Sequence, residues 1–319
     1  MDLSILIVTF NSSNFIESAI NSIQSSITKY TYEVIIVDNN SSDGTPQILK
    51  DKYSDLKLIF QNYNYGFANG MNKAFQSSEG RYILSFNPDA ELKTDSIERV
   101  ISYLELKDSV GLVGGSVENS EGEIEMPATG HPLLPIRFYK GLFRQTANPS
   151  KIKSIKTDVI WGTGLVTRSD LLDDGILFQE VSFLFGEEYY LARKILSKSK
   201  EVLVYPDFRL KHHKSVSFKF DEFKTILAIK LKECATYKIN YRKYGLFLSK
   251  VASLVLSIDS ILLIIRVYIG SIRKKNTTLS KRMIKKYKAM FIVRLYTLLI
   301  GHQYCASINR TAEAYFNKQ

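Results

Sequence analysis

The sequence, 319 residues long, has little of what marks several protein classes. Its two cysteines, Cys234 and Cys305, cannot form a disulfide framework and lack the spacing of a metal site, so a reducing cytoplasm fits best. The first residues, MDLSILIVTF, hold no basic stretch and no small-residue cleavage site, which predicts that no secretory leader is present. Low-complexity tracts are absent too, and 45% hydrophobic content indicates a globular chain rather than a disordered one.

Acidic residues are scarce in one part of the chain only. Up to position 221 there are 24 Lys and Arg against 28 Asp and Glu, a net charge of −4. Beyond it there are 19 against 4, a net charge of +15. A segment with such an excess seeks phosphate, either in nucleic acid or at an anionic membrane surface.

The same basic region contains the most apolar stretch, LFLSKVASLVLSIDSILLIIRVYIG. Lys250, Asp259 and Arg266 interrupt it, so no window is expected to meet the requirement of about 20 apolar residues for a spanning helix. We predict basic amphipathic helices over 221–319 that lie on an anionic membrane surface. The alternative is a helical bundle packed on the main domain, with its lysines in solvent.

The first 116 residues alternate strand and helix patterns. Short β-rich runs (LSILIVTF, YEVIIVDNN, LKLIFQN, RYILSFNPD and VGLVGGSV) alternate with helix patterns, and this predicts an α/β fold with a mostly parallel sheet covered on both faces. Loops at the carboxyl ends of parallel strands form the ligand crevice of such sheets. Asp38, Asn64 and Asp89 fall at or just after such ends, so we expect them to share one rim.

The chain then becomes irregular over 117–156 before strand patterns return in DVIWGTGLVTR. FLFGEEYYLARKIL leads into a helix, and EVLVYPDFRLKHHKSVSF is expected to form a pair of strands ending in histidines. We therefore expect one domain over 1–220, with halves 1–116 and 117–220, and a helical region over 221–319.

The order of the polar motifs is more specific than any one of them. VTFN is followed by VDNNSSDG, NYGFANGMN, FNPD, WGTG, FGEEYYLAR and a histidine after a strand. This series, from residue 3 to about 217, resembles the family 2 inverting glycosyltransferases, which have the GT-A nucleotide-sugar fold. It is most similar to the rhamnosyltransferase-like branch that builds bacterial surface polysaccharides such as O-antigen, capsule and cell-wall glycans.

The resemblance implies transfer of one sugar from a UDP- or dTDP-activated donor (rhamnose, galactose or N-acetylhexosamine) to a hydroxyl of a lipid-linked glycan, at the cytoplasmic face of the plasma membrane. The QxxRW signature of processive synthases is absent, which favours addition of a single sugar over polymerisation. Oligomer formation through the C-terminal helices stays open.

Donor contacts are implied for a set of rim residues: Thr9, Asn11, Asp38, Asn64, Gly66, Asn72, Asn87 and Asp89. Asp38 would read the pyrimidine imide N–H, although an Asx turn or a helix cap would also explain an Asp there. Asn64, Gly66 and Asn72 would contact ribose and sugar. Gly66 is equally explained by a helix start.

A divalent cation, Mn²⁺ or Mg²⁺, would neutralise the donor diphosphate. Asp89 is the expected carboxylate ligand, because Pro88 fixes the backbone just before it. By resemblance Asp89 is the last acid of the family's Asp-x-Asp motif, whose first acid is Asn87 here. A histidine ligand is implied as well: spacing favours His212, and a one-residue slip would select His213.

Inverting transfer needs a base for the acceptor hydroxyl, and the helix N-terminus at GEEYYLAR suits a carboxylate there. The resemblance assigns this role to Glu188, with Glu187 as the competitor. Trp161 and Gly164 are expected to contact the acceptor, although a core tryptophan is nearly as good an explanation.

Two other functions compete with catalysis. The basic C-terminal helices could bind nucleic acid or a membrane without any catalysis, but no nucleic-acid signature is present and the first two thirds of the chain are slightly acidic, so nucleic acid is not an expected partner. A degenerate transferase that binds a partner is the other possibility.

Overall fold

The computed structural model describes residues 1–26, 29–119, 122, 124–125, 154–158, 160, 162–172, 174–213, 222–274 and 277–318. Ten strands form one sheet: β1 Leu3–Thr9, β2 Tyr32–Asp38, β3 Lys57–Phe60, β4 Tyr82–Phe86, β5 Ala90–Leu92, β6 Val110–Glu118, β7 Ile124–Glu125, β8 Ile155–Lys156, β9 Gly164–Arg168 and β10 Glu201–His212. The helices are α1 Ile16–Ser26, α2 Thr45–Lys52, α3 Phe67–Gln76, α4 Ser96–Leu106, α6 Glu187–Ser197, α8 Glu222–Lys274, α9 Thr277–Leu299 and α10 His302–Phe316.

The sheet runs in the order β3-β2-β1-β4-β9-β6-β10-β5. Strands β3, β2, β1 and β4 are parallel neighbours, as the alternating sequence pattern predicts. Strand β9 enters antiparallel between β4 and β6, and β5 pairs antiparallel with β10. The α/β expectation is confirmed, and the parallel half of the sheet brings the carboxyl ends of β1, β2 and β4 to one edge.

Both faces of the sheet are covered. Along β1, Leu3, Ile5 and Ile7 enter a core that contains residues of α1 and α4, whereas Leu6 and Val8 enter a second core with α3 and α6. Successive side chains of a strand point to opposite faces, so a run of apolar residues without alternation is what a doubly covered strand requires.

The segment that leads up to the histidines corrects one expectation. EVLVYPDFRLKH forms a single strand, β10, rather than a strand pair. Its pairing with β6 shifts register between Tyr205 and Arg209, around Pro206, a residue that cannot donate to the ladder.

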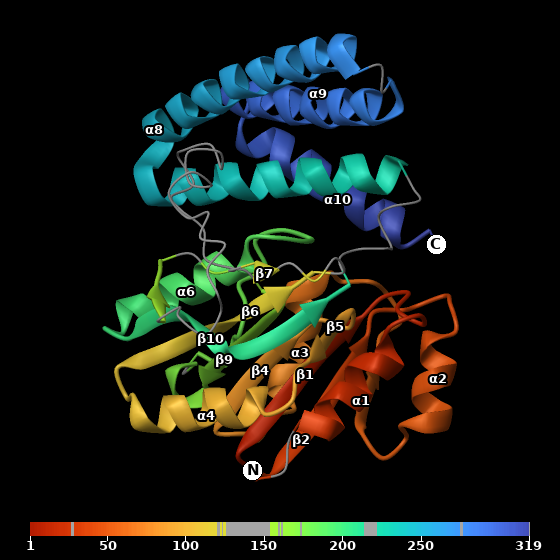
Figure 1. Ribbon diagram of the computed structural model, residues 1–319, viewed down its shortest axis with the longest axis vertical. Coiled ribbons are helices and arrows are strands. Elements are labelled where there is room, and N and C mark those ends of the chain that lie inside the picture. Colours follow the sequence, from red (N-terminus) through yellow and green to blue (C-terminus); the bar gives the residue numbers. More distant parts are fainter. Residues whose placement is uncertain are drawn as a thin grey trace.

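The C-terminal helices stand as a layer on one end of the α/β domain (Figure 1). Helix α8 is broken at Gly245, where φ is 77° and ψ −179°, into a first limb (222–244) and a second limb (246–274). The first limb and α10 share a core, including Leu231, Tyr237 and Ile308, with the aromatic residues of 183–185 packed against it. The second limb and α9 form a hairpin on the side away from the sheet (Figure 1).

Two expectations for this region need revision. The first limb and α10 pack on the main domain, as the bundle alternative states. In addition, Tyr244–Ile269 is long and apolar enough to cross a membrane, and the expectation that no window would meet this test was wrong. The interrupting charges are few, and Asp259 is buried within the helical layer.

Candidate active site

Thr9 and Asp38 end the neighbouring strands β1 and β2 in register, so both lie at the rim. The Thr9 hydroxyl donates to Asp38 Oδ1 (2.7 Å), as does the Ser41 hydroxyl (2.6 Å), and the Ser41 N–H donates to Oδ2 (2.9 Å). Asp38 thus holds the loop after β2 through the backbone N–H three residues on, a local structural role close to the Asx turn or cap left open from sequence. Oδ2 has the capacity to accept one further hydrogen bond, because each carboxylate oxygen can accept two.

Asn11 holds the adjacent loop from the end of β1. Its φ of 53° lies in the left-handed region that Asn tolerates best among residues with a side chain. Its side-chain oxygen accepts the N–H groups of Ser42 (2.9 Å) and Asp43 (3.3 Å). Asn11 therefore fixes the loop that leads into α2, on the same side of the sheet as Asp38.

The NYGF segment is fixed by glycine geometry and a local hydrogen bond. Asn64 Oδ1 accepts the Gly66 N–H (3.0 Å). Gly66 has φ 89° and ψ 173°, a combination essentially restricted to glycine, and a Cβ there would lie 2.6 Å from the Phe183 carbonyl oxygen. The loop before α3 therefore packs directly on the loop before α6. The position of Gly66 at the start of α3 agrees with its helix-start explanation.

Asn64 is also held from the far end of the chain. Asn317, at the end of α10, accepts the Asn64 N–H through Oδ1 (2.7 Å) and donates to the Asn64 carbonyl through Nδ2 (3.1 Å). Beside it, the Phe316 ring stacks on Phe183 with 5.4 Å between centroids and meets Phe10 edge-on. Sequence reasoning missed this contact, and no local sequence pattern predicts it.

Asn72 does not contact the rim in the way expected from sequence. Its side-chain oxygen accepts the N–H groups of Leu177 (3.1 Å) and Phe178 (2.9 Å), and its NH₂ donates to the Phe178 carbonyl (2.8 Å) and to Glu180 (3.3 Å). All its hydrogen-bonding capacity is used, and it is 7% exposed. Asn72 positions the 177–180 loop, and its contact with a sugar stays a prediction.

Asp89 and His212 meet although 123 residues separate them in sequence. Strand β5 starts at Ala90 and pairs with His212, which brings the His212 ring nitrogen Nε2 to 3.1 Å from Asp89 Oδ1. Both side chains are partly exposed. Asn87, between β4 and this pair, takes its backbone position from a hydrogen bond between its N–H and the Thr163 carbonyl (3.2 Å).

The neighbouring histidine faces elsewhere. His213 Nε2 lies 2.7 Å from Glu91, and its ring stacks on Phe15. Alternation along β10 therefore separates the two histidines, and His212 is the one beside Asp89. Among the described residues no group of three or more His, Cys, Asp and Glu side chains gathers as a metal cluster.

Glu187 and Glu188 begin α6 after a strained turn. Phe185 (φ 71°) and Gly186 (φ 97°) are consecutive left-handed residues, and sequestered strain of this kind is typical of functional sites. Glu187 is 4% exposed, whereas Glu188 is partly exposed and accepts backbone hydrogen bonds that include the Gly162 and Gly186 N–H groups.

Burial raises the pKa of both carboxyls, and the negative charge of Glu188 raises the pKa of Glu187 further. A raised pKa makes each carboxylate a better proton acceptor than an ordinary glutamate. Gly162 matters here, because a Cβ at that position would lie 2.7 Å from Glu188 Oε1. The first glycine of the WGTG motif therefore leaves space for the Glu188 side chain.

Two further residues, Gly164 and Trp161, were expected to contact the acceptor. Gly164 is buried in β9, and a Cβ there would lie 2.9 Å from Leu210, so packing explains a glycine at this position. Trp161 lies outside the described residues.

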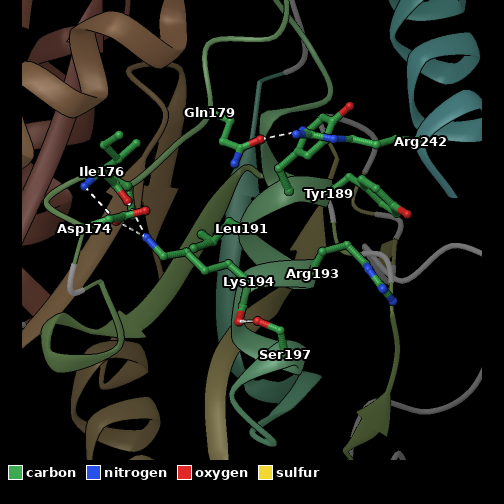
Figure 2. A pocket seen from close by; sticks show the side chains of 11 residues that line it. Asp174, Ile176, Gln179, Tyr189, Leu191, Arg193, Lys194, Ser197 and Arg242 are labelled. Atoms are coloured by element: carbon green, nitrogen blue, oxygen red, sulfur yellow. Dashed lines mark hydrogen bonds and ion pairs between the residues drawn. The ribbon is translucent and has the colours of Figure 1, made fainter.

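An open pocket of about 470 Å³ lies on the flank of α6 (Figure 2). Tyr189, Arg193 and Lys194 line it from the helix, and Arg242 reaches in from α8 to donate to Gln179 (2.8 Å). None of the site residues expected from sequence is among its lining residues. The pocket is therefore distinct from the rim that holds Asp38 and Asp89.

Comparison with known proteins identifies the family of the chain. The model of the family "Glycosyl transferase family 2" matches residues 4–174. An uncharacterized glycosyltransferase of Haemophilus influenzae is 29% identical over 122 residues, 36% of each chain. The N-acetylglucosaminyl-diphospho-decaprenol L-rhamnosyltransferase of Mycobacterium tuberculosis is 24% identical over 242 residues, 67% of this chain and 77% of that one. A UDP-Glc:alpha-D-GlcNAc-diphosphoundecaprenol beta-1,3-glucosyltransferase of Escherichia coli is 30% identical over 36% of this chain and 46% of its own length.

Solved structures share the fold over nearly the whole chain. The mannosyltransferase PcManGT from Pyrobaculum calidifontis, in complex with GDP-Man and Mn²⁺, has a TM-score of 0.59 at 16% identity and covers 94% of this chain and 87% of its own. S. aureus TarS 1–349 in complex with UDP-GlcNAc has a TM-score of 0.55 at 17% identity, covering 100% and 92%. The family match spans more than half of the chain, so the chain belongs to glycosyl transferase family 2, and the solved structures show the same fold.

Proposed function

We propose that the protein transfers one sugar, with inversion, from a nucleotide-diphosphate donor to a hydroxyl of a lipid-linked bacterial glycan. The observation that carries this is the Asp89–His212 contact at the rim that also holds Asp38. Relatives named for decaprenol- and undecaprenol-linked acceptors support the acceptor class. We expect a UDP or dTDP donor of rhamnose, galactose or N-acetylhexosamine; the UDP-sugar named for the E. coli relative supports UDP, and the name of the M. tuberculosis relative supports rhamnose.

Asp89 and His212 fit a divalent cation. They offer one carboxylate oxygen and one imidazole nitrogen on facing backbones, a mixed set that suits Mn²⁺ better than Mg²⁺. The cation, when bound, neutralises charge on the donor diphosphate. Asn87 in place of an acid leaves this site with one negative charge fewer, and the donor phosphates complete the set.

The donor base binds next to Asp38, with Thr9 and Asn11 holding that wall. The free acceptor capacity of Asp38 Oδ2 suits a pyrimidine imide N–H, and Asn64 and Gly66 shape the adjoining loop for ribose and sugar.

Glu188 acts as the base. Its carboxylate takes the proton of the acceptor hydroxyl while that oxygen forms a bond to the anomeric carbon, and the bond from this carbon to the diphosphate oxygen breaks. The nucleoside diphosphate leaves with the bonding electrons. Glu188 is preferred over Glu187, because Glu187 is almost completely buried while Glu188 is partly exposed.

We assign a separate role to each part of the chain. Residues 1–116 form the donor half, 117–220 the acceptor half, and 221–319 a helical region that associates with the membrane from the cytoplasmic side. The +15 charge beyond residue 221 supports this placement.

Thermal unfolding with nucleotides tests the donor site first. We expect UDP or dTDP, and not GDP or ADP, to stabilise the protein in the presence of Mn²⁺, by about 2.7 kcal/mol at roughly 100 times Kd. The effect should disappear with a chelator and in Asp89→Ala. A folded protein that responds to none of the four nucleotides would refute the donor site.

A matched pair of variants tests the base. Glu188→Gln should lower kcat by about 10²- to 10⁴-fold while the nucleotide still binds, and Glu187→Gln should cost far less. The opposite order would assign the base to Glu187.

A further inference from the structure

The distal hairpin, formed by the second limb of α8 and by α9, has its polarity inverted. Large apolar side chains face outward along the second limb at alternating intervals of four and three residues: Phe247, Val251, Leu254, Ile258, Ile261 and Ile265, each between 40% and 77% exposed. This spacing places them in one stripe along the helix. Residues 292–299 of α9 expose further large apolar side chains.

The inside of the hairpin carries a row of small polar side chains beside apolar ones such as Leu256 and Val293. Ser249, Ser253 and Ser260 of α8 and Thr297 of α9 are each at most 5% exposed. The Thr297 hydroxyl lies 3.3 Å from that of Ser253.

A buried ion pair completes this polar seam. Arg294 of α9, 8% exposed, donates to both carboxylate oxygens of Glu233 on the first limb (2.6 and 3.0 Å). It also donates to the Ser260 hydroxyl (2.6 Å) and to the Leu256 carbonyl (2.8 Å) of the second limb. One guanidinium thus joins both limbs of α8 to α9.

Water would favour the opposite arrangement, because apolar area is stabilised by leaving water and a buried charge is costly even when paired. In an apolar medium, the polar groups of a helix pair turn toward each other and its apolar side chains face the medium. The inverted pattern therefore indicates that the outer face of the hairpin meets hydrocarbon.

We propose that the outer stripe of the second limb is buried in the acyl layer of one bilayer leaflet, with the hairpin lying along the membrane rather than crossing it. Crossing is disfavoured because the sequence from 273 to 288 carries eight Lys and Arg and no acid. Those charges suit the phosphates of the near leaflet. The inference rests on the proposed function, because a lipid-linked acceptor would then be met at the same surface.

The charge pattern favours lipid over a second copy of the chain as the occupant. Two copies joined through this stripe would bring two basic segments of like charge together, which opposes association. An anionic bilayer instead offers opposite charge beside an apolar layer.

Vesicle flotation separates the contribution of the apolar stripe to membrane binding from that of the basic residues. We expect the wild type to float with phosphatidylcholine vesicles and more strongly when phosphatidylglycerol is added. The double variant Leu254→Glu, Ile258→Glu should lose binding to both by about tenfold or more, whereas Lys285→Ala, Lys286→Ala should lose only the gain from the anionic lipid. Leu106→Glu adds a charge at a leucine of α4 that is 82% exposed, and should change nothing.

The failure of this inference can be told apart from that of the proposed function. Nucleotide-induced stabilisation should be the same in Leu254→Glu, Ile258→Glu as in the wild type, since the stripe is remote from the rim. A stripe variant that floats like the wild type would overturn the inference. So would a wild-type dimer that the stripe variant splits while vesicle binding is unaffected, because a second copy would then cover the stripe.

Depth distinguishes lying from crossing. Brominated acyl chains should quench the Ile258→Trp variant and leave Lys286→Trp at the level of the wild type, whose Trp161 is common to both variants. Equal added quenching at both positions would overturn the proposed orientation.

Discussion

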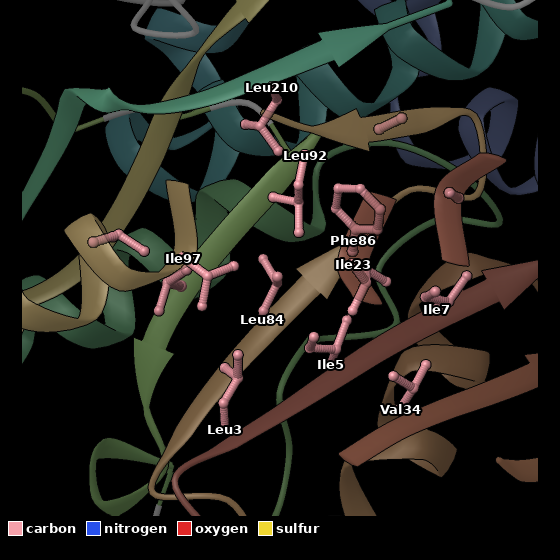
Figure 3. Close-up of a cluster of buried hydrophobic side chains, with 14 of the residues drawn as sticks. Leu3, Ile5, Ile7, Ile23, Val34, Leu84, Phe86, Leu92, Ile97 and Leu210 are labelled. Atoms are coloured by element: carbon pink, nitrogen blue, oxygen red, sulfur yellow. The ribbon is translucent and has the colours of Figure 1, made fainter. Parts of the chain in front are cut away.

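The α/β domain and the distal hairpin differ in the side chains that they bury. In the domain, Leu3, Ile5 and Ile7 point into the core (Figure 3) and are inaccessible to solvent. In the hairpin, the polar Ser249 and Ser260 are as inaccessible as the apolar Val293, and Phe247 is 77% exposed. Both regions belong to one chain, so the difference teaches that the surroundings, more than the composition, set what is inside.

The boundary between the two regimes lies at Gly245. The first limb of α8 and α10, on the near side, bury apolar residues such as Leu231 and Ile308 in the ordinary way. α10 also reaches the rim through Phe316 and Asn317. The helical layer therefore has one face adapted to the enzyme domain and one adapted to an apolar medium.

The largest effect that would test this comparison is expected from the polar seam. Arg294→Ala leaves Glu233 as a buried carboxylate without its guanidinium, which should destabilise the helical region by about 3–5 kcal/mol. Denaturant unfolding followed by circular dichroism measures it, with the exposed Arg310→Ala as the control. A loss no larger than that of the control would mean that the seam is hydrated and that the inversion is superficial.

Two glycine substitutions test the packing of loops in the α/β domain. Gly66→Ala places a Cβ 2.6 Å from the Phe183 carbonyl oxygen at a φ of 89°, and should cost about 1–3 kcal/mol from strain and more from the contact. Gly175→Ala, at a φ of 70° with nothing within 4 Å of its Cβ, carries the strain alone.

We expect Gly66→Ala to weaken nucleotide binding in addition to stability, and Gly175→Ala to lower the melting temperature only. Equal behaviour of the two variants in both assays would show that the contact between the loops before α3 and α6 is not required.

The raised pKa of Glu187 predicts an unusual dependence of stability on pH. The folded state binds this proton more tightly than the unfolded state, so from the unfolded pKa up to the folded pKa stability falls as pH rises. Glu187→Gln should remove this loss and raise the melting temperature at about pH 8 more than at about pH 5. The exposed Asp55→Asn is the control. A gain independent of pH would argue against a buried ionised Glu187.

Much of the fold follows from local pattern. Apolar runs of strand length between helix patterns suffice to predict β1, β2 and β4, because a doubly covered parallel sheet imposes that pattern. The same argument predicts that Asp38 and Asp89 share a rim. Which histidine faces Asp89 needs the pairing of β10 with β5, and the two-residue alternation then places His212 there.

Other features depend on contacts between distant segments. The packing role of Gly164 depends on Leu210, and the loop-holding role of Asn72 depends on backbone groups of Leu177 and Phe178. The inversion of the hairpin is likewise absent from a hydropathy average, because it depends on which side of α8 faces α9. Amphipathic spacing alone predicts an apolar stripe without saying whether it faces inward.

The smallest effect is expected where the two regions meet, at Asn317. Asn317→Ala removes two hydrogen bonds to the Asn64 backbone, so we expect a loss of about 1 kcal/mol in donor affinity, seen as a few-fold rise in KM for the donor with kcat nearly unchanged. Asn317→Asp keeps the acceptor for the Asn64 N–H and should lie between the two, and Lys318→Ala should match the wild type. A lower kcat at unchanged KM would mean instead that α10 acts on the turn before Glu188, through Phe316 and Phe183, and not on the donor loop.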